Sequence, residues 1–590
     1  MLCQRKAFCL GSLIFFLCIG QLAFADDLSR KQKVDEIFSN WDRVDSPGYA
    51  VAVFKNGEVV HNKGYGMANL DEQTPLSPES VLCLLSLSKS FTSASVAIAM
   101  DQGHFGPDDD VRAYIPELHE FEIPISIKHL LTCRSGLRDF YFCMPLLGRN
   151  VEDAFTSEDV LDVIGRQKTL MIRPGEKWSY SNTDYFLLAE VIHRTTGKTL
   201  REFAEEHIFE PLNMKHTLFQ DTPLFPHRRR AVGYSHRQNK FTRHESRSDC
   251  WQGAGGVWTT TNDMFRWDEC LRTQRGLPKG KFATEFLRDG SLLGNEQCLS
   301  AYPSQNYRGA KRIWYSGGGL GFVAHYVRFP DHDLSIVVLG NHDTDGSWPD
   351  SVESVKKLAD LYIGDQLKPK PEVVKRNHEW DKTVSAAPAL SPERLSELET
   401  FAGSYCRSDN DFVELTLDRG QLQLAAITRH WQYGFRQTLQ NINGNRFRSA
   451  RGYDEFEISF NSKNKDDSDE KLTDPSRPTI RVQFEEGRDK VWTPVKLTSW
   501  TPKQLEALEG EYYCDELESV HRVTSTDGQL FVQYNFGRKR LHSPTTPDTF
   551  VPAAEQFCIP VRFLRDELGT AIAFSINFGR AGEVTFQKRK

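Results

Sequence analysis

A serine and a lysine three positions apart, Ser86 and Lys89, stand at the head of a run of small and apolar residues that ends at Gly103. A serine hydroxyl is a weak nucleophile until a base removes its proton, and a partly desolvated lysine one helical turn away can be that base. The free backbone N–H groups at a helix start also suit the oxyanion that forms when a serine attacks a carbonyl group. These residue types at this spacing predict acyl transfer through a serine.

The tetrapeptide Ser-x-x-Lys is a weak signal by itself, because it also begins at Ser354, Ser462 and Ser468. The last two lie in a charged stretch, and Ser354 lies in an amphipathic helical pattern. Ser86 differs from these because the run that follows it is apolar on nearly every side, which predicts a helix buried within a domain.

Two further polar boxes follow in order, Tyr180-x-Asn182 and Tyr315-Ser316-Gly317. Taken alone, Tyr180 reads as a core tyrosine and Asn182 as a helix-cap residue. Behind Ser-x-x-Lys they complete the three-box layout of the penicillin-binding proteins and class A β-lactamases. The order of the boxes therefore favours a catalytic interpretation over the structural one.

In its details the chain resembles the penicillin-recognising serine hydrolases, in their class C β-lactamase-like branch. The resemblance runs from about Tyr49 to Asn341 and includes Leu130-Leu131-Thr132, Ser135-Gly136, Pro174-Gly175-Glu176, Gly255-Gly256 with Asp263, and Gly317-Gly318 with Gly321-Phe322. It implies that Ser86 is the nucleophile, that Lys89 activates it, and that Tyr180 relays a proton to the leaving group. It also implies substrate-binding roles for Asn182, Tyr315, Gly317 and Gly318, with the N–H groups of Ser86 and Gly318 as the oxyanion hole.

The chain departs from this family at two places. Tyr315 stands where the third box usually begins with His or Lys, and Cys133-Arg134 replaces the usual His-Thr before Ser135. A cation at the first position binds a substrate carboxylate, whereas tyrosine offers only a hydroxyl. The change favours aminopeptidase, amidase or esterase action over hydrolysis of β-lactams or D-Ala-D-Ala peptides.

The 590 residues are too many for one hydrophobic core and predict several domains. Strand patterns near 49–60 and 322–339 flank a helical pattern near 183–196, and a further helical pattern near 352–363 closes the region. This arrangement predicts an α+β catalytic domain with an antiparallel sheet, over 26–365. A proline-containing linker is expected at 366–393. The segment from Gly403 through Tyr405 to Cys406 then matches that from Gly510 through Tyr512 to Cys514. This repeat predicts two similar, lipocalin-like antiparallel barrels, over 394–500 and 501–590, and the three-domain layout resembles that of D-aminopeptidases.

The N-terminus predicts export. Arg5 and Lys6 precede an apolar run, and Ala23-Phe24-Ala25 fits a cleavage site, so residues 1–25 are expected to be a signal peptide and the mature protein to be periplasmic or extracellular. An uncleaved membrane anchor is the alternative. The net charge of −7 gives no reason to expect nucleic acid as a partner, and with no CxxC pair a zinc site of that kind is not expected.

Together these observations predict an exported serine hydrolase that needs no cofactor and cleaves a small peptide, amide or ester, D-amino-acid compounds included. Two alternatives stay open at this point. One is a β-lactamase or D,D-carboxypeptidase, and the other is an inactive relative whose barrels bind peptidoglycan or a protein.

Overall fold

The computed structural model describes residues 29–149, 155–222, 229–237, 240–244, 252–289, 301–343 and 347–369, and between 391 and 589 it describes the helices and strands with short gaps. The expected signal peptide, most of the expected linker and the charged stretch at 462–476 lie outside the described residues. The chain forms two compact units, Met1–Gly106 with Leu188–Pro371, and Pro107–Leu187 with Glu372–Lys590.

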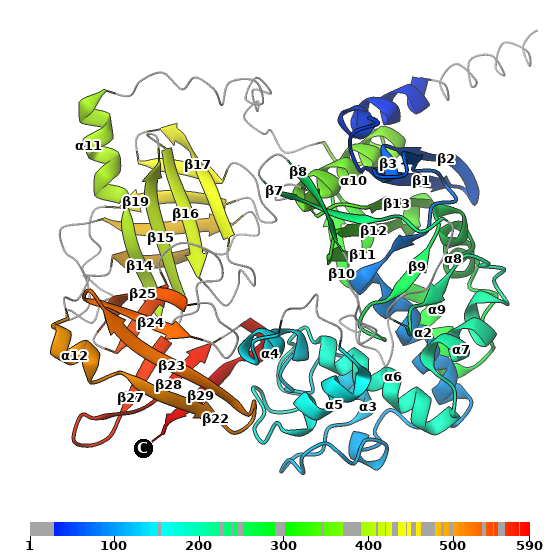
Figure 1. Ribbon diagram of the computed structural model, residues 1–590. Helices are drawn as coiled ribbons and strands as arrows, with labels where there is room; N and C mark the ends of the chain where they lie inside the picture. Colours follow the sequence, from blue (N-terminus) through cyan, green and yellow to red (C-terminus); the bar gives the residue numbers. More distant parts are fainter. Residues whose placement is uncertain are drawn as a thin grey trace, which may run out of the picture. The chain divides into compact units, whose positions relative to one another are not determined.

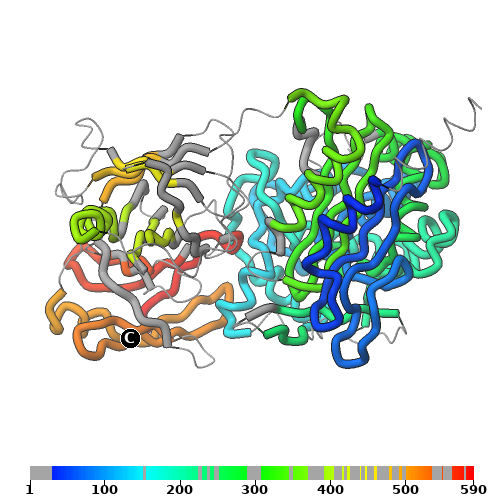
Figure 2. The backbone as a smooth tube through the Cα atoms, turned by 90° about the horizontal axis from the view of Figure 1, so that it is seen from above, coloured from blue at the N-terminus to red at the C-terminus, as the bar shows by residue number. Residues whose placement is uncertain are grey.

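An antiparallel six-stranded sheet, in the order β10-β11-β12-β13-β1-β2, forms the centre of the first unit. Its strands are β1 (Tyr49–Lys55), β2 (Glu58–Tyr65), β10 (Ala301–Tyr307), β11 (Ala310–Gly319), β12 (Phe322–Phe329) and β13 (Leu334–Gly340). Tyr49 of β1 lies opposite Gly340 of β13, and Figure 2 shows the early strands in blue beside the later ones in green. The prediction of one sheet built from both ends of this region is confirmed.

The turn between β1 and β2 follows from its two residues. Asn56 and Gly57 have φ values of 53° and 77°, and a two-residue hairpin turn of type I′ requires positive φ at both positions. Asparagine tolerates this conformation and glycine adopts it without steric cost. The Asn-Gly pair therefore places β2 antiparallel to β1, with Lys55 opposite Glu58.

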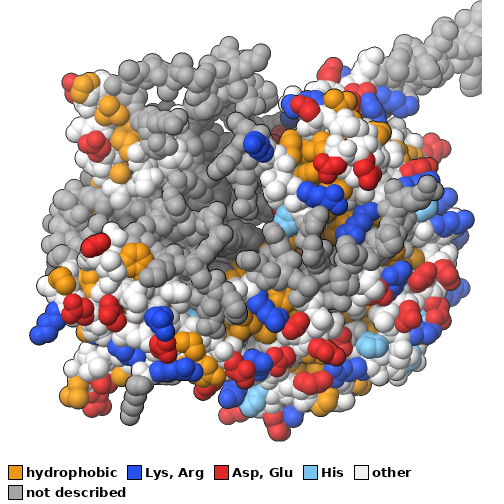
Figure 3. Space-filling model, in the orientation of Figure 1, with side chains coloured by type: hydrophobic (Ala, Val, Ile, Leu, Met, Phe, Trp, Pro, Cys, Tyr) orange, Lys and Arg blue, Asp and Glu red, His pale blue; other side chains and the backbone are white. Residues whose placement is uncertain are grey.

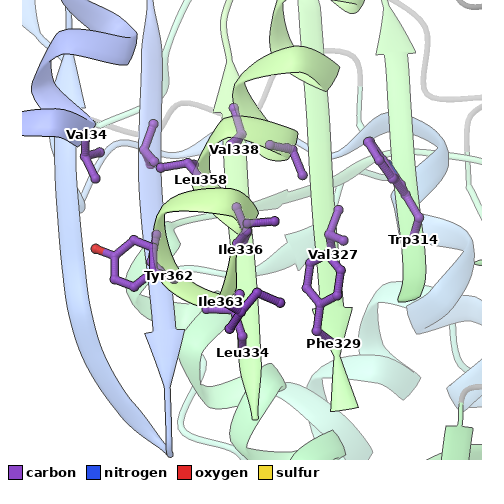
Figure 4. Packing of buried hydrophobic residues seen from close by; sticks show 14 of the residues in the cluster. Val34, Trp314, Val327, Phe329, Leu334, Ile336, Val338, Leu358, Tyr362 and Ile363 are labelled. Carbon is purple, nitrogen blue, oxygen red and sulfur yellow. The ribbon is translucent and has the colours of Figure 1, made fainter. Parts of the chain in front are cut away.

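One face of the sheet is covered by helix α10 (Ser347–Ile363) and by a helix over residues 29–38. Leu358 and Ile363 of α10 are wholly buried and lie against Ile336 and Val338 of β13 (Figure 4). Burying each such side chain contributes about 1.5–3 kcal/mol. This hydrophobic layer holds the two helices against that face of the sheet.

The remaining elements of the first unit include the helix on which the predicted nucleophile depends. Every residue from Lys89 to Met100 in α2 is buried, as its apolar pattern predicts. The full set of these remaining elements of the first unit is η1 (Ser39–Trp41), β3 (Met67–Asn69), β4 (Thr74–Pro75), β5 (Leu82–Cys83), η2 (Leu85–Ser88), α2 (Lys89–Asp101), α7 (Leu200–Ala204), η4 (Glu205–Phe209), β6 (Leu218–Phe219), β7 (Gly233–Arg237), β8 (Lys240–His244), β9 (Val257–Thr259), α8 (Thr261–Thr273), α9 (Lys281–Asp289) and η5 (Pro330–His332).

The second unit begins with a helical segment whose helix starts are capped by side chains. Ser126, Asp139 and Thr156 each accept a hydrogen bond from a backbone N–H in the first turn that follows, which satisfies donors that the helix itself leaves unpaired. The elements are η3 (Val111–Ala113), α3 (Ile127–Leu131), α4 (Phe140–Leu146), α5 (Ser157–Gly165) and the start of α6 (Asn182–Thr196).

Among the described residues from Gly403 on, the strands β14 to β21 and β22 to β29 form two closed antiparallel sets (Figure 1). The first set, preceded by α11 (Pro392–Phe401), is β14 (Gly403–Ser408), β15 (Asp411–Asp418), β16 (Gln421–Ile427), β17 (Phe435–Asn443), β18 (Arg446–Ser449), β19 (Phe456–Asn461), β20 (Thr479–Phe484) and β21 (Asp489–Pro494). The second, preceded by α12 (Pro502–Glu506), is β22 (Gly510–Cys514), β23 (Ser519–Thr526), β24 (Gln529–Gln533), β25 (Lys539–Thr546), β26 (Thr549–Pro552), β27 (Val561–Arg565), β28 (Ala571–Asn577), η7 (Gly579–Ala581) and β29 (Glu583–Lys588).

The sequence repeat has the same structural role in both sets of strands. The Tyr405 hydroxyl donates to the Phe401 carbonyl at 2.8 Å, and the Tyr512 hydroxyl donates to the Leu508 carbonyl at 2.7 Å. Both tyrosines are fully buried. Each one therefore closes the bend between a short helix and the first strand of its set.

The surface carries both signs of charge. On the face seen in Figure 3, Lys and Arg side chains are interspersed with Asp and Glu over the described parts. Within those parts, no helix has the length and apolar character that crossing a bilayer requires.

Candidate active site

The predicted site residues fall into two groups. Ser86, Lys89 and the third box from Tyr315 to Gly318 belong to the first unit, whereas Tyr180 and Asn182 belong to the second.

Ser86 lies in the short 3₁₀ turn η2, and the α-helix begins only at Lys89. The apolar run after Ser86 predicted that this serine stands at the head of the α-helix itself. The difference begins at Leu85, whose φ of 48° is unusual for a residue with a branched side chain. Strained residues of this kind cluster at functional sites. The 3₁₀ turn keeps Ser86 and Lys89 on one side, because it has three residues per turn.

Lys89 is completely buried, and its Nζ donates a hydrogen bond of 2.5 Å to the carbonyl oxygen of Ala254. The same glycine-rich segment holds the start of α2 at two more points. Thr92 Oγ1 donates to the Gly253 carbonyl at 2.8 Å, and Ser88 Oγ accepts from the backbone N–H of Val257 at 3.0 Å. The Gly255-Gly256 motif thus belongs to a segment that aligns the lysine.

Strand β11 approaches Ser86 through a glycine. A Cβ atom on Gly317 would lie 2.1 Å from the Leu84 carbonyl oxygen and 2.7 Å from the Ser86 backbone nitrogen. Only glycine permits this approach of backbone to backbone. The neighbouring Gly318 is exposed. The strand edge at Gly317 and Gly318 therefore lies beside the backbone of the predicted nucleophile.

Tyr315 has only 1% of its surface exposed. Its ring stacks on that of Tyr326 with 5.5 Å between centroids, and the Tyr326 hydroxyl donates to Asp268 at 2.7 Å. Burial raises the pKa of Asp268, and the Arg328 guanidinium 3.8 Å away opposes that rise. Tyr315 is thus part of a buried polar cluster between the sheet and α8.

In the second unit, Asn182 is held by a buried aspartate. Its backbone N–H and its Nδ2 both donate to Asp139 Oδ2, at 3.1 and 3.2 Å. The next residue strengthens the same contact, because Thr183 Oγ1 accepts from the backbone N–H of Phe140 at 2.8 Å. The start of α6 is therefore joined to the start of α4.

Arg580, a residue that no sequence motif indicated, contacts the same aspartate from η7. Its Nε donates to Asp139 Oδ2 at 2.7 Å, and its guanidinium carbon lies 4.8 Å from the centre of the Tyr180 ring. The Arg580 and Asp139 side chains are 8% and 1% exposed. Since 441 positions separate the two residues, no local sequence pattern could have indicated the pair.

A second buried carboxylate supports the Ser135-Gly136 and Tyr180-x-Asn182 motifs. Ser135 Oγ and Ser181 Oγ donate to Asp184 Oδ1 at 2.6 and 2.8 Å. Burial raises the pKa of the Asp184 carboxyl to about 7, and the two hydroxyl donors oppose the rise. One carboxyl group thus ties together two of the motifs on which the family resemblance rests.

Among the described residues, no group of three or more His, Cys, Asp or Glu side chains is arranged to hold a metal. Cys83 comes directly before the loop that carries Ser86, and burial raises the pKa of its thiol to about 11. A thiol of that kind stays protonated near neutral pH and is a poor nucleophile.

Known proteins share sequence similarity with this chain over the region that contains the three boxes. The model of the family described as Beta-lactamase matches residues 35–357, more than half of the chain. A D-aminopeptidase of Brucella anthropi is 29% identical over 324 residues, which are 54% of this chain and 59% of that protein. Penicillin-binding protein 4* of Bacillus subtilis is 26% identical over 393 residues, or 63% of this chain and 82% of that protein. The chain thus spans less than two thirds of the D-aminopeptidase's length.

Among solved structures, the octameric penicillin-binding protein homologue from Pyrococcus abyssi matches with a TM-score of 0.50 and 20% identity. The match covers 79% of this chain and 99% of that one. At this identity the likeness concerns the fold, a mixture of helices and antiparallel sheet.

Proposed function

Because the chain belongs to the beta-lactamase family, we propose that it is a serine hydrolase that cleaves an amide or ester bond through an acyl-enzyme on Ser86. The proposed reaction class is that of a D-aminopeptidase, an amidase or an esterase. The observation that carries the proposal is the buried Lys89, held by the Ala254 carbonyl one 3₁₀ turn after a serine. Burial of a charged lysine costs free energy because the ammonium group loses its hydration, so a wholly buried lysine indicates a functional role.

In this mechanism the Ser86 hydroxyl oxygen attacks the substrate carbonyl carbon while Lys89 accepts its proton. The N–H groups of Ser86 and Gly318 stabilise the resulting oxyanion. Tyr180 gives a proton to the leaving amine or alcohol as the carbon–leaving group bond breaks, which leaves an ester on Ser86. Water then attacks this ester and gives one proton to Tyr180, the bond between the acyl carbon and Ser86 breaks, and Lys89 returns its proton to the Ser86 oxygen as the acid product departs.

The third box, Tyr315-Ser316-Gly317, favours neutral or amine-bearing substrates over substrates that carry a carboxylate. Tyr315 supplies no permanent cation, and it is buried against Tyr326. Asn182 would bind the substrate's amide, together with the strand edge at Gly317 and Gly318. The substrates that fit are small peptides, amides or esters, among them compounds of D-amino acids.

A second candidate is a β-lactamase or D,D-carboxypeptidase. It is supported by the match to penicillin-binding protein 4*, which extends over 82% of that protein. A third candidate, an inactive relative that binds peptidoglycan or a protein, predicts no acylation at Ser86.

The domain layout and the export of the protein are part of the proposal. Residues 26–365 would form the catalytic domain, and 394–500 and 501–590 two barrels that repeat one another. Tyr405 and Tyr512 make equivalent hydrogen bonds, each to a backbone carbonyl four residues earlier, and this supports the repeat. For export, N-terminal sequencing of the secreted product should give a start near Asp26. A membrane-bound product that retains Met1 would contradict it.

The test of the function is a substrate panel. Purified protein is assayed with D-amino-acid amides, neutral esters, β-lactams and a D-Ala-D-Ala peptide, and mass spectrometry locates the acyl adduct. Ser86→Ala should abolish both hydrolysis and adduct. The matched control is Ser354→Ala, because Ser354 begins the same tetrapeptide but lies on α10 and donates to the Asp350 carbonyl. Full activity of Ser86→Ala would refute the assignment of all three boxes.

A further inference from the structure

Arg580 belongs to the second set of strands but contacts the box that contains Tyr180. Its Nε donates to Asp139 Oδ2 at 2.7 Å, and its guanidinium lies over two aromatic rings, 4.8 Å from the centre of Tyr180 and 4.5 Å from that of Phe142. Cation–π contacts favour such a position for a guanidinium group.

The contact around Arg580 involves backbone as well as side chains. The Asp139 N–H donates to the Arg580 carbonyl at 3.0 Å, and Arg138 Nη1 donates to the Ala581 and Glu583 carbonyls at 2.6 and 2.8 Å. Gly582 completes the approach, because its φ of 68° and a Cβ position only 2.6 Å from the Met171 sulfur exclude a side chain there without rearrangement. The turn that carries Arg580 is therefore fixed in place by hydrogen bonds on both sides.

Asp139 connects Arg580 to the start of α6. Its Oδ2 accepts from Arg580 Nε and also from both donors of Asn182, while its Oδ1 accepts from the Tyr141 N–H that it caps. A buried carboxylate that loses its cation loses most of what compensates its charge. The position of Asn182 thus depends on an arginine from the end of the chain.

We propose that Arg580 is a positioning residue for Tyr180 and Asn182, so that the second set of strands completes the second box of the active site. This inference rests on the proposed function, because it assigns Arg580 a role in leaving-group protonation by Tyr180. Arg580 reaches the substrate only through these two residues and is not itself a catalytic residue.

A merely structural ion pair and a positioning residue predict different kinetics. Protonation of the leaving group matters for an amide, whose amine cannot depart as an anion, and hardly for an activated ester such as a nitrophenyl ester. Loss of the positioning role should therefore affect the two substrates unequally. General destabilisation of the fold would lower both to the same extent.

The experiment compares kcat/KM for a D-amino-acid amide and for the nitrophenyl ester of the same acyl group in full-length wild type, Arg580→Met and Arg580→Lys. Arg580→Met should lower the amide reaction about 10–100-fold, less than the roughly 10²–10⁴-fold typical of losing a general acid because Tyr180 itself is kept, and the ester reaction less than about 3-fold. Arg580→Lys keeps the charge and should recover part of the loss. The control is Arg522→Met, which breaks an exposed ion pair with Glu511 in the same set of strands and should change neither reaction.

A second readout does not depend on turnover. Hydrogen exchange of a peptide covering residues 177–187 should accelerate in Arg580→Met and not in Arg522→Met. Equal losses for amide and ester, or unchanged exchange in this peptide, would overturn the positioning role. Failure of the proposed function looks different, because Ser86→Ala would then keep the wild-type activity while the exchange result still tests the contact.

Discussion

The Nζ of Lys89 donates a 2.5 Å hydrogen bond to the carbonyl oxygen of Ala254, a residue 165 positions later in the chain. A lysine ammonium has three donors and no acceptor, so a buried one needs oxygen partners to offset its lost hydration. The carbonyl supplies one partner without adding a negative charge. It therefore fixes the position of the amine at the start of α2, directly after the 3₁₀ turn that contains Ser86.

Replacing Lys89 with methionine should lower the rate of Ser86 acylation by about 10²–10⁴-fold, the usual effect of removing a general base. Methionine keeps the length and apolar bulk of the side chain, so the fold should survive. The measurement is single-turnover formation of the acyl adduct. Lys357→Met is the control, because Lys357 ends the other Ser-x-x-Lys in a described helix and is exposed. Acylation at the wild-type rate in Lys89→Met would exclude Lys89 as the base.

Gly317→Ala should impair activity without any change in a functional side chain. The new Cβ would lie 2.1 Å from the Leu84 carbonyl oxygen, so β11 or η2 must move. Such a shift displaces the strand edge from the Ser86 N–H, and loss of one oxyanion donor costs about 10²–10³-fold in kcat. The expected result is a fall in kcat with circular dichroism unchanged. An alanine variant as active as wild type would show that this approach is not needed for catalysis.

Tyr315→Phe should weaken turnover only slightly, because it removes one hydroxyl contact of about 0.5–1.5 kcal/mol and keeps the stacking on Tyr326. Tyr315→His introduces a possible cation and should shift the ratio of kcat/KM toward carboxylate-bearing substrates. The comparison is a neutral ester against a β-lactam or D,D-peptide. If the wild-type protein already prefers carboxylate-bearing substrates, another cation must bind the carboxylate, and Arg134 is the first residue to test.

Asp184 should make stability depend on pH. Burial raises the pKa of its carboxyl to about 7 from 3.8, so between roughly pH 4 and 7 the folded protein keeps a proton that the unfolded chain has released. The free energy of unfolding therefore falls as pH rises through this window, by up to about 4 kcal/mol, and is level above it.

Asp184→Asn mimics the protonated carboxyl and should remove this dependence. The thermal midpoint of the variant, relative to wild type, should be higher at pH 8 than at pH 5. The same difference at both pH values would mean that Asp184 does not titrate in this range.

Local patterns in the sequence predicted local structure well. The strand patterns near 49–60 and 322–339 indicated strands of the central sheet, and the apolar run after Ser86 indicated the buried α2. Each of these signals lies within a few residues of the structure it specifies. The family resemblance rested on such local motifs, and the match of the family model confirms it.

Features set by distant contacts were not predictable in the same way. The 3₁₀ turn at Ser86 depends on the φ of Leu85 and on the approach of β11, which no pattern near Ser86 encodes. The burial of Tyr315 follows from its stacking on the neighbouring strand. Arg580 stood in an ordinary Gly-Arg-Ala turn, and only the fold gives it Asp139 as a partner.

The separation of Asp139 from Arg580 also has a consequence for biosynthesis. A ribosome adding about 5–20 residues per second needs roughly 20–90 s to make the 441 positions between them. For most of that time the nascent chain already contains Asp139, Tyr180 and Asn182 but lacks the arginine that compensates the buried carboxylate. The second box therefore reaches its final arrangement only near the end of translation, and a chain released early would contain the predicted nucleophile but not the completed site.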